Sequence, residues 1–270
     1  HQRDYLGGTL PVDRYTFIIY HSLHNRPHDY TGDGLEHSAS TLCLFNSAMD
    51  SSLLNTFVYG IASHEFFHII TPLTVHSEEI QQYDFLAPVM SQHLWLYEGM
   101  TEYTTLHMPV MEKLEPLDAF LEKIRRKAME MKRFDNTIPL TELSRAAVER
   151  QDQYYNFYLK GALVCLCLDI RLRELSEGKY GTRDLMRDLS KKYGKDTPFR
   201  DQELFDVITS MTFPDIRAFF RDYVEGAQPL PLEQYLTKAG IRFDARRMSV
   251  TPLPDATPAQ LELRKWWIGL

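Results

Sequence analysis

The sequence predicts an α+β fold, in which a short β region is followed by helices over most of the chain. Runs rich in β-branched and aromatic residues, typical of strands, lie within the first 50 residues. From about Ser51 onward, apolar residues recur at three- and four-residue spacing, which is typical of helices. A third observation is the run IASHEFFHIITPL at 61–73, which places two histidines four residues apart on the first of these helices.

The predicted elements follow in order along the chain. Residues 14–21 (RYTFIIYH) and 40–45 (STLCLF) are predicted strands, and the segment between them is a polar loop. The first helix starts near Ser51 and is ended or bent by Pro72. Glycines and prolines separate the later helices, which we expect at about 92–107, 116–133, 153–177, 182–193, 201–211, 214–224 and 232–239. This divides the chain into a sheet region at about 1–50 and a helical region at about 51–240.

Composition excludes two classes of protein. The 270 residues carry a net charge of −7, which argues against a nucleic-acid-binding surface. The basic run KIRRK at 123–127 alternates with apolar residues, and we expect it to be a solvated helix face. No apolar run approaches the roughly 18 residues that a membrane span needs. We therefore expect a protein that binds no nucleic acid and has no membrane span in this segment.

The motif His64-Glu65-Phe66-Phe67-His68 matches the pattern H-E-x-x-H. On a helix, His64 and His68 lie on one face one turn apart, so both imidazoles can reach one ion. Glu65 would then lie beside the open coordination position, where a general base can take a proton from a metal-activated water. The alternative is a buried helix that merely contains histidines, so the motif needs a third ligand elsewhere in the chain.

The best third ligand is Glu98 in the segment HLWLYEGMTEY, 30 residues after His68 on the next predicted helix. A zinc hydrolase uses three protein ligands, His or carboxylate, and leaves one position open. Glu102 lies one turn further along the same face, where its carboxylate can accept the free ring N–H of a ligating histidine. The alternative is that Glu98 and Glu102 are ordinary solvent-exposed glutamates on one face of the helix.

Together these segments resemble the glycyl aminopeptidase family of gluzincin zinc metallopeptidases. HEFFH and LWLYEGMTEY resemble its zinc-binding segments, and two further matches lie in the family's order, Gly34-Leu35-Glu36-His37 and Tyr158-Leu159-Lys160-Gly161-Ala162. The resemblance covers about residues 5–245. It implies a thermolysin-like catalytic domain, with a small antiparallel sheet followed by a mainly α-helical bundle.

The resemblance also implies an activity. One Zn²⁺ per chain would be held by His64, His68 and Glu98, Glu65 would be the general base, and the Tyr158 hydroxyl would assist catalysis. Gly34 and Glu36 would bind the substrate, with Glu36 pairing with the α-ammonium of a peptide or protein N-terminus. The expected reaction is the release of small N-terminal residues, glycine or alanine. Asp33 and Ile69 depart from the family pattern in the substrate cleft and bear on this preference.

The resemblance predicts a catalytic domain at 1–248, with 249–270 being a linker or the start of a C-terminal PDZ-like domain. The tail SVTPLPDATPAQ has the composition of an extended connection. The chain begins at His1 without a signal-peptide pattern, so we expect a piece of a longer protein whose N-terminal β-rich domain and PDZ-like domain are absent here. Location stays open, with a lean toward a periplasmic or secreted protein.

Three rival readings stay open on the sequence alone. The first is an endopeptidase of the same architecture, in which Glu36 is only part of the cleft wall. The second is a non-catalytic peptide-binding relative, and the third is a structural zinc protein, although such sites usually have four ligands and are rich in cysteine. The remaining histidines are expected to be ordinary hydrogen-bonded residues: His21, His24, His28, His37, His76, His93 and His107.

Overall fold

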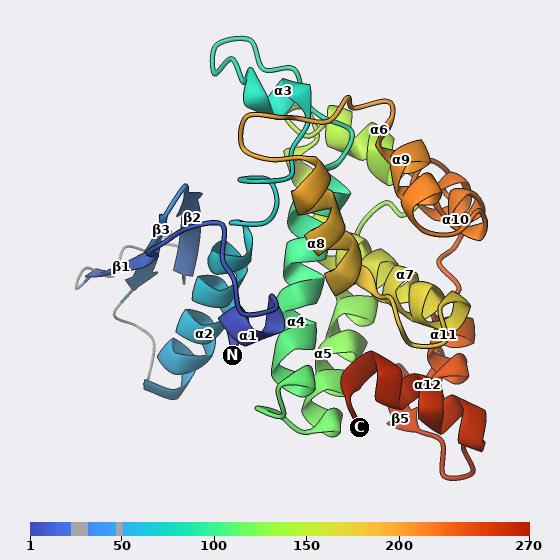
Figure 1. Cartoon of the computed structure of the whole chain (residues 1–270). Coiled ribbons are helices and arrows are strands. Elements are labelled where there is room, and N and C mark those ends of the chain that lie inside the picture. Colours follow the sequence, from blue (N-terminus) through green and yellow to red (C-terminus); the bar gives the residue numbers. More distant parts are fainter. Residues whose placement is uncertain (23–31, 47–50) are drawn as a thin grey trace.

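A three-stranded sheet lies at one end of the molecule, and the rest consists of helices and one short pair of strands, β4 and β5 (Figure 1). The computed structural model describes residues 1–22, 32–46 and 51–270. The sheet comprises β1 (Thr16–Ser22), β2 (Gly32–His37) and β3 (Ser40–Asn46), in the order β1-β3-β2. The expected α+β order, strands before helices, is what the chain shows.

The sheet is mixed, which corrects the prediction of a small antiparallel sheet. β2 pairs with β3 antiparallel, whereas β1 pairs with β3 parallel, with Thr16 opposite Ser40. The composition of the segment GDGLEH, which forms β2, is that of a polar loop, because glycine and aspartate are poor strand formers. The family resemblance of Gly34-Leu35-Glu36-His37 does predict a strand here, and the structure has one. Alternation along a strand identifies its faces but not the direction of its neighbour, so the sequence contained no signal for the parallel pair.

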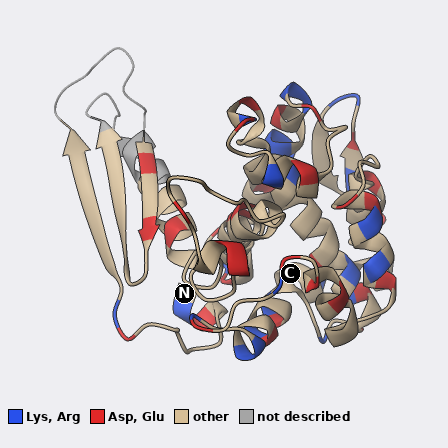
Figure 2. Cartoon of the chain, turned by 90° about the horizontal axis from the view of Figure 1, so that it is seen from above, with Lys and Arg blue, Asp and Glu red and all other residues tan. Residues whose placement is uncertain are grey.

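The inner face of the sheet packs on α2 (Ser51–Phe67), which lies between the sheet and the other helices (Figure 1). Thr41, Cys43 and Phe45 of β3 alternate inward and are buried. The outer face carries Ile18, Tyr20, Leu35, Leu42 and Leu44, all of them exposed. β1 and β3 contain no Lys, Arg, Asp or Glu (Figure 2). The outer face of the sheet is thus apolar and exposed to solvent. The inner face is covered at β3 but not at β1, where Phe17 and Ile19 are exposed.

Two short helical segments carry site residues and have π-helical geometry. They are η1 (Trp95–Met100), which continues as α4 (Thr101–Met111), and η4 (Phe157–Gly161), which continues as α7 (Ala162–Leu175). Single π-turns inside helices are frequent at functional sites. The predicted helices at 92–107 and 153–177 are thus present, but each begins with an irregular turn that hydrophobic spacing does not reveal.

The remaining elements build a helical body around one large apolar core that includes Trp95, Phe120 and Trp267. They are α1 (Gln2–Tyr5), α3 (Glu78–Gln81), α5 (Leu117–Glu130), η2 (Met131–Arg133), α6 (Leu140–Arg145), η3 (Gln151–Gln153), α8 (Thr182–Lys192), α9 (Leu204–Met211), α10 (Asp215–Tyr223), α11 (Leu232–Lys238), β4 (Ile241–Asp244), β5 (Ser249–Pro252) and α12 (Pro258–Ile268). In the described part of the chain, none of the helices combines the length and apolarity that a membrane span requires.

The C-terminal segment differs from the predicted linker. Residues 249–252 form β5, paired with β4, and α12 packs against α7 and α4. Thr257 caps α12 with its side chain, and Trp267 near its end is completely buried. Proline and threonine suggested an extended connection, but Pro258 occupies the first turn of a helix, where its missing N–H costs nothing. The domain boundary at 248 stays a prediction.

Candidate metal centre

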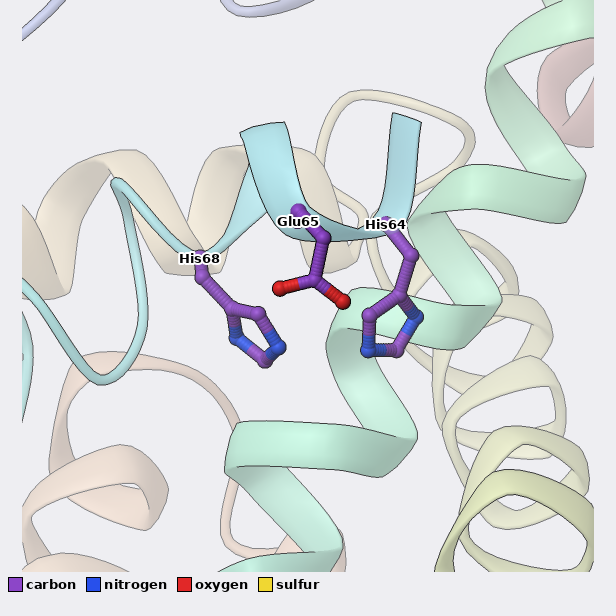
Figure 3. Close-up of side chains that lie close together, drawn as sticks. All are labelled: His64, Glu65 and His68. Atoms are coloured by element: carbon purple, nitrogen blue, oxygen red, sulfur yellow. The ribbon is translucent and has the colours of Figure 1, made fainter. Parts of the chain in front are cut away.

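The two histidines of the motif and Glu98 converge on one point between α2 and η1. Both imidazoles point to the same side of α2, with the Glu65 carboxylate between them (Figure 3). One carboxylate oxygen of Glu98, Oε2, lies 3.2 Å from His64 Nε2 and 3.6 Å from His68 Nε2. In a tetrahedral zinc site with bonds of about 2.0 to 2.1 Å, two ligand atoms lie about 3.3 Å apart. The donor set fits a zinc ion in both atom type and spacing.

The other ring nitrogen of each histidine is held by an acceptor. His68 Nδ1 donates to the carbonyl oxygen of Thr71 at 2.9 Å, and His64 Nδ1 donates to Glu102 Oε2 at 2.9 Å. These contacts leave Nε2 of each ring facing Glu98, so Nε2 is the nitrogen that each histidine can offer to a metal ion. Glu102 therefore lies where the sequence places it, one turn beyond Glu98 and against the ring of His64.

The electrostatics of the site favour a positive charge. Burial alone would lower the pKa of His64, but its hydrogen bonds with Glu102 and Glu98 raise it to about 10. Burial would raise the pKa of Glu98, but the hydrogen bond from His64 and the charge of His68 lower it to about 2. Burial lowers the pKa of His68. In the metal-free protein a proton on His64 thus occupies a place that a metal cation can take.

Glu65 is buried beside these ligands. Burial raises its pKa to about 7, and the charge of His64 opposes this shift while that of Glu36 adds to it. A carboxylate with a pKa near neutrality can both accept and return a proton in one reaction cycle. The Glu65 side chain fills the space beside Gly34 of β2, because a Cβ atom on Gly34 would lie 2.7 Å from Glu65 Cγ.

Gly34 and Glu36 lie on the face of β2 that points toward α2. Burial alternates along this strand, so residues 32, 34 and 36 are half-buried and residues 33, 35 and 37 are exposed. The charge of Glu36 raises the pKa values of both Glu65 and His68, so this carboxylate lies within electrostatic reach of the cluster. β2 is an edge strand, and among the described residues no further strand pairs with its outer edge.

Tyr158 of η4 and Tyr154, which directly follows η3, extend to the same place. The ring of Tyr158 lies 5.3 Å from that of His64, centroid to centroid, and burial holds its pKa well above the usual value. Its hydroxyl is therefore neutral and can donate a hydrogen bond. The Tyr154 hydroxyl donates to Glu98 Oε1 at 3.1 Å. Tyr154 lies four residues before Tyr158, and this helical spacing is the sequence signal that could have identified it as a site residue.

The other histidines of the described chain lie away from this cluster or are buried in other networks. His93 Nε2 donates to the backbone carbonyl oxygen of Asp201, and His107 lies between Tyr5 and Trp267. His21 and His37 are exposed on the sheet, and His76 contacts Gln81. His24 and His28 lie outside the described residues. Where they are described, these histidines form no part of the predicted ligand set.

Comparison with known proteins bears directly on this geometry. Residues 58–164 match the profile of the M61 glycyl aminopeptidases, and this range contains the two histidines of the motif, Glu98, Glu102, Tyr154 and Tyr158. The resemblance to the M61 glycyl aminopeptidase family is confirmed. This match supports a peptidase, that is, a hydrolase of peptide bonds. No curated protein sequence matches the chain.

A solved structure shares the fold. It is an aminopeptidase N family protein from Idiomarina loihiensis, which superposes with a TM-score of 0.76 at 23% sequence identity. The match covers 89% of this chain but only 43% of that protein. The M61-like domain described here thus corresponds to less than half of the relative's length.

Proposed function

We propose that this chain is the catalytic domain of a zinc-dependent aminopeptidase that releases small N-terminal residues. The observation that supports it most is the convergence of His64 Nε2 and His68 Nε2 on one oxygen of Glu98, at 3.2 and 3.6 Å, beside a buried Glu65. Three ligands with a proton acceptor next to them are the donor set of a catalytic rather than a structural zinc site.

His64, His68 and Glu98 would hold one zinc ion per chain. When bound, the metal would supply a Lewis acid that polarises the substrate carbonyl and lowers the pKa of a water molecule from 15.7 to about 7. Thr71 and Glu102 keep the two imidazoles in the orientation that this requires. The Tyr154 hydroxyl contacts the oxygen of Glu98 that faces away from the histidines and thereby orients the third ligand.

Glu65 would transfer the proton, and Tyr158 would stabilise the negative charge that develops on the substrate carbonyl oxygen. Glu65 takes a proton from the attacking water and returns it to the leaving amine, which its pKa of about 7 allows near neutral pH. Tyr158, whose raised pKa keeps the hydroxyl protonated, donates a hydrogen bond to the oxyanion that develops on the substrate carbonyl. Removal of one such donor costs roughly 3 kcal/mol in other enzymes.

Glu36 would make the enzyme an aminopeptidase. An extended peptide can pair with the free edge of β2, and its first residue would then end near Glu36. The carboxylate would bind the α-ammonium of the substrate through a charge-assisted contact of roughly 1.5–3 kcal/mol. The same charge would disfavour any peptide that continues past this point. The preference for glycine or alanine rests on the family resemblance.

A paired assay tests this proposal. Wild-type protein with and without chelator is given a tripeptide with an N-terminal alanine and its N-acetylated form. We expect zinc-dependent cleavage of the free peptide only, and a loss of about 10- to 100-fold in kcat/KM for Glu36→Gln. Asp13→Asn is the control, because Asp13 is an exposed carboxylate in the segment before β1. Equal cleavage of both peptides by the wild type would indicate an endopeptidase.

A further inference from the structure

Lys127 is a buried cation that connects two parts of the candidate site. It lies on α5 in the run KIRRK, yet only 8% of its surface is exposed, which corrects the expectation of a solvated face at this residue. Its ammonium group donates to Glu102 Oε1 at 2.6 Å and to the carbonyl oxygen of Tyr158 at 2.9 Å. By contrast, the side chains of Lys123 and Arg126 on the same helix are 40% and 65% exposed.

The contacts of Lys127 form a continuous connection from the metal ligand to η4. Glu102 divides its two oxygens, since Oε2 accepts from His64 Nδ1 and Oε1 accepts from Lys127 Nζ. Lys127 in turn contacts the backbone of Tyr158, whose ring lies against that of His64. Four elements that are distant in sequence, α2, α4, α5 and η4, are thus joined by three hydrogen bonds.

We propose that Lys127 is a positioning residue that keeps the Glu102 carboxylate against His64 and the Tyr158 backbone in place for catalysis. This inference rests on the proposed function. Lys127 acts through the groups it holds and is not a catalytic residue. A buried ammonium is retained at a cost in desolvation, and here two acceptors from two different elements offset that cost.

The two contacts predict two separate effects of removing the ammonium group. Without it, Glu102 loses the partner on Oε1, so its carboxylate can rotate and hold His64 less firmly. Loss of a group that orients a metal-bound histidine typically lowers metal affinity by about 10- to 100-fold. The carbonyl of Tyr158 would also lose its partner, and the hydroxyl proposed to contact the oxyanion would be less well placed, which lowers kcat more than it changes KM.

The test measures zinc affinity and turnover separately. Metal-free protein is titrated with zinc against a chromophoric chelator, and kcat and KM are measured for an alanyl peptide on the zinc-loaded protein. We expect Lys127→Met to weaken zinc binding by about 10- to 100-fold. We also expect a lower kcat at saturating zinc with little change in KM. Lys123→Met and Arg126→Met are matched controls on the same helix and should equal the wild type.

A second variant and a double variant separate positioning from general structure. Lys127→Gln keeps a donor of similar length, so it should fold and show a smaller loss of zinc affinity in the same direction. In a Glu102→Gln background, Lys127→Met should cause little further loss of zinc affinity, because both changes remove the same contact.

Two results would overturn the inference in distinguishable ways. If the wild type binds zinc and cleaves peptides, but both Lys127 variants match it in zinc affinity and kcat, Lys127 has no positioning role and the proposed function stands. If the wild type binds no zinc, the proposed function fails and the inference fails with it.

Discussion

Gly34 lies on β2 opposite the side chain of Glu65, where there is no room for a Cβ atom. Such an atom would lie 2.7 Å from Glu65 Cγ and Oε1 and 2.7 Å from Ile61 Cγ2. Real Cβ atoms do not approach other atoms so closely, so either the strand or the Glu65 carboxylate would have to move. The glycine therefore sets the distance between the edge strand and the proposed general base.

Gly34→Ala should accordingly lower activity while the metal stays bound. We expect kcat to fall by at least about 10-fold, toward the value of a Glu65→Gln variant, because proton transfer depends on hydrogen-bond reach. Zinc content should equal that of the wild type, since no ligand is touched. Turnover and metal analysis of the purified variant are the measurements.

The control for this change is Gly60→Ala on α2, where a Cβ would meet nothing within 4 Å. Alanine is favoured over glycine in a helix by about 0.8–1 kcal/mol, so this variant should keep its activity and be slightly more stable. Full activity of Gly34→Ala would show that Glu65 does not depend on this close approach.

Site residues that recur at four-residue spacing on a helix could be predicted from the sequence, whereas site residues outside such a pattern could not. His64, His68, Glu98 and Glu102 repeat at four-residue spacing on two helices, and the structure brings them together. Lys127 could not be found this way, because KIRRK has the same charge pattern whether its last residue faces solvent or a buried carboxylate. Burial of one lysine depends on how α5 packs against α4 and η4, which is a tertiary property.

At the scale of elements, η1 and η4 cross in close contact. This contact brings Glu98, the proposed third metal ligand, close to Tyr154 and Tyr158. A Cβ on Gly99 would lie 2.7 Å from the carbonyl carbon and 2.8 Å from Cα of Gly161, so the two backbones are in direct contact. Glu98 precedes the first glycine, and Tyr158 lies three residues before the second. The close contact thus makes the hydrogen bond from Tyr154 to Glu98 possible.

Gly99→Ala should therefore be more damaging than Gly161→Ala. At Gly99 the added atom meets backbone, which cannot move aside, whereas at Gly161 the nearest atom would be 3.1 Å away and a small shift suffices. Overpacking of this kind costs about 1–3 kcal/mol. We expect the Gly99 variant to lose about 2–3 kcal/mol in the free energy of unfolding and the Gly161 variant about 1 kcal/mol.

Urea unfolding of both zinc-free variants beside the wild type measures this difference. Equal stability of the two variants would contradict the asymmetry of the contact.

The π-helical turns themselves could not have been predicted, because the spacing of apolar residues fits an α-helix equally well. The composition of β2 carries no strand signal for a related reason, and only the family resemblance predicts a strand there. The glycines that weaken the signal are required by the approach of β2 to α2.

At the scale of the whole molecule, the candidate metal centre joins two parts of the fold. His64 lies on α2, which packs against the sheet, and His68 directly follows the end of α2 at Phe67. Glu98 belongs to η1, which is packed in the helical body (Figure 1). A ligand that binds only the folded state stabilises it by an amount that grows with its concentration, about 2.7 kcal/mol at 100 times its Kd. Zinc should therefore raise the melting temperature, and chelator should lower it.

The size of this shift should depend on pH with a definite sign. In the metal-free protein the pKa of His64 is raised to about 10, so it carries a proton at neutral pH, whereas the lowered pKa of His68 leaves that ring neutral. The proton on His64 stabilises the metal-free fold fully below about pH 6.5, and this contribution is lost as the pH rises through about 10. Zinc must displace this proton, so its apparent affinity rises with pH.

Thermal unfolding between pH 6 and 8, with and without a fixed excess of free zinc, measures both effects. We expect the zinc-induced increase in melting temperature to be larger at pH 8 than at pH 6, and calorimetry to show about one proton released per zinc bound. Glu98→Ala removes the one ligand contributed by η1, so its melting temperature should respond little to zinc at either pH. A zinc shift that is equal in this variant and the wild type would place the metal elsewhere in the chain. A shift that decreases toward pH 8 would mean that the metal does not compete with the proton on His64.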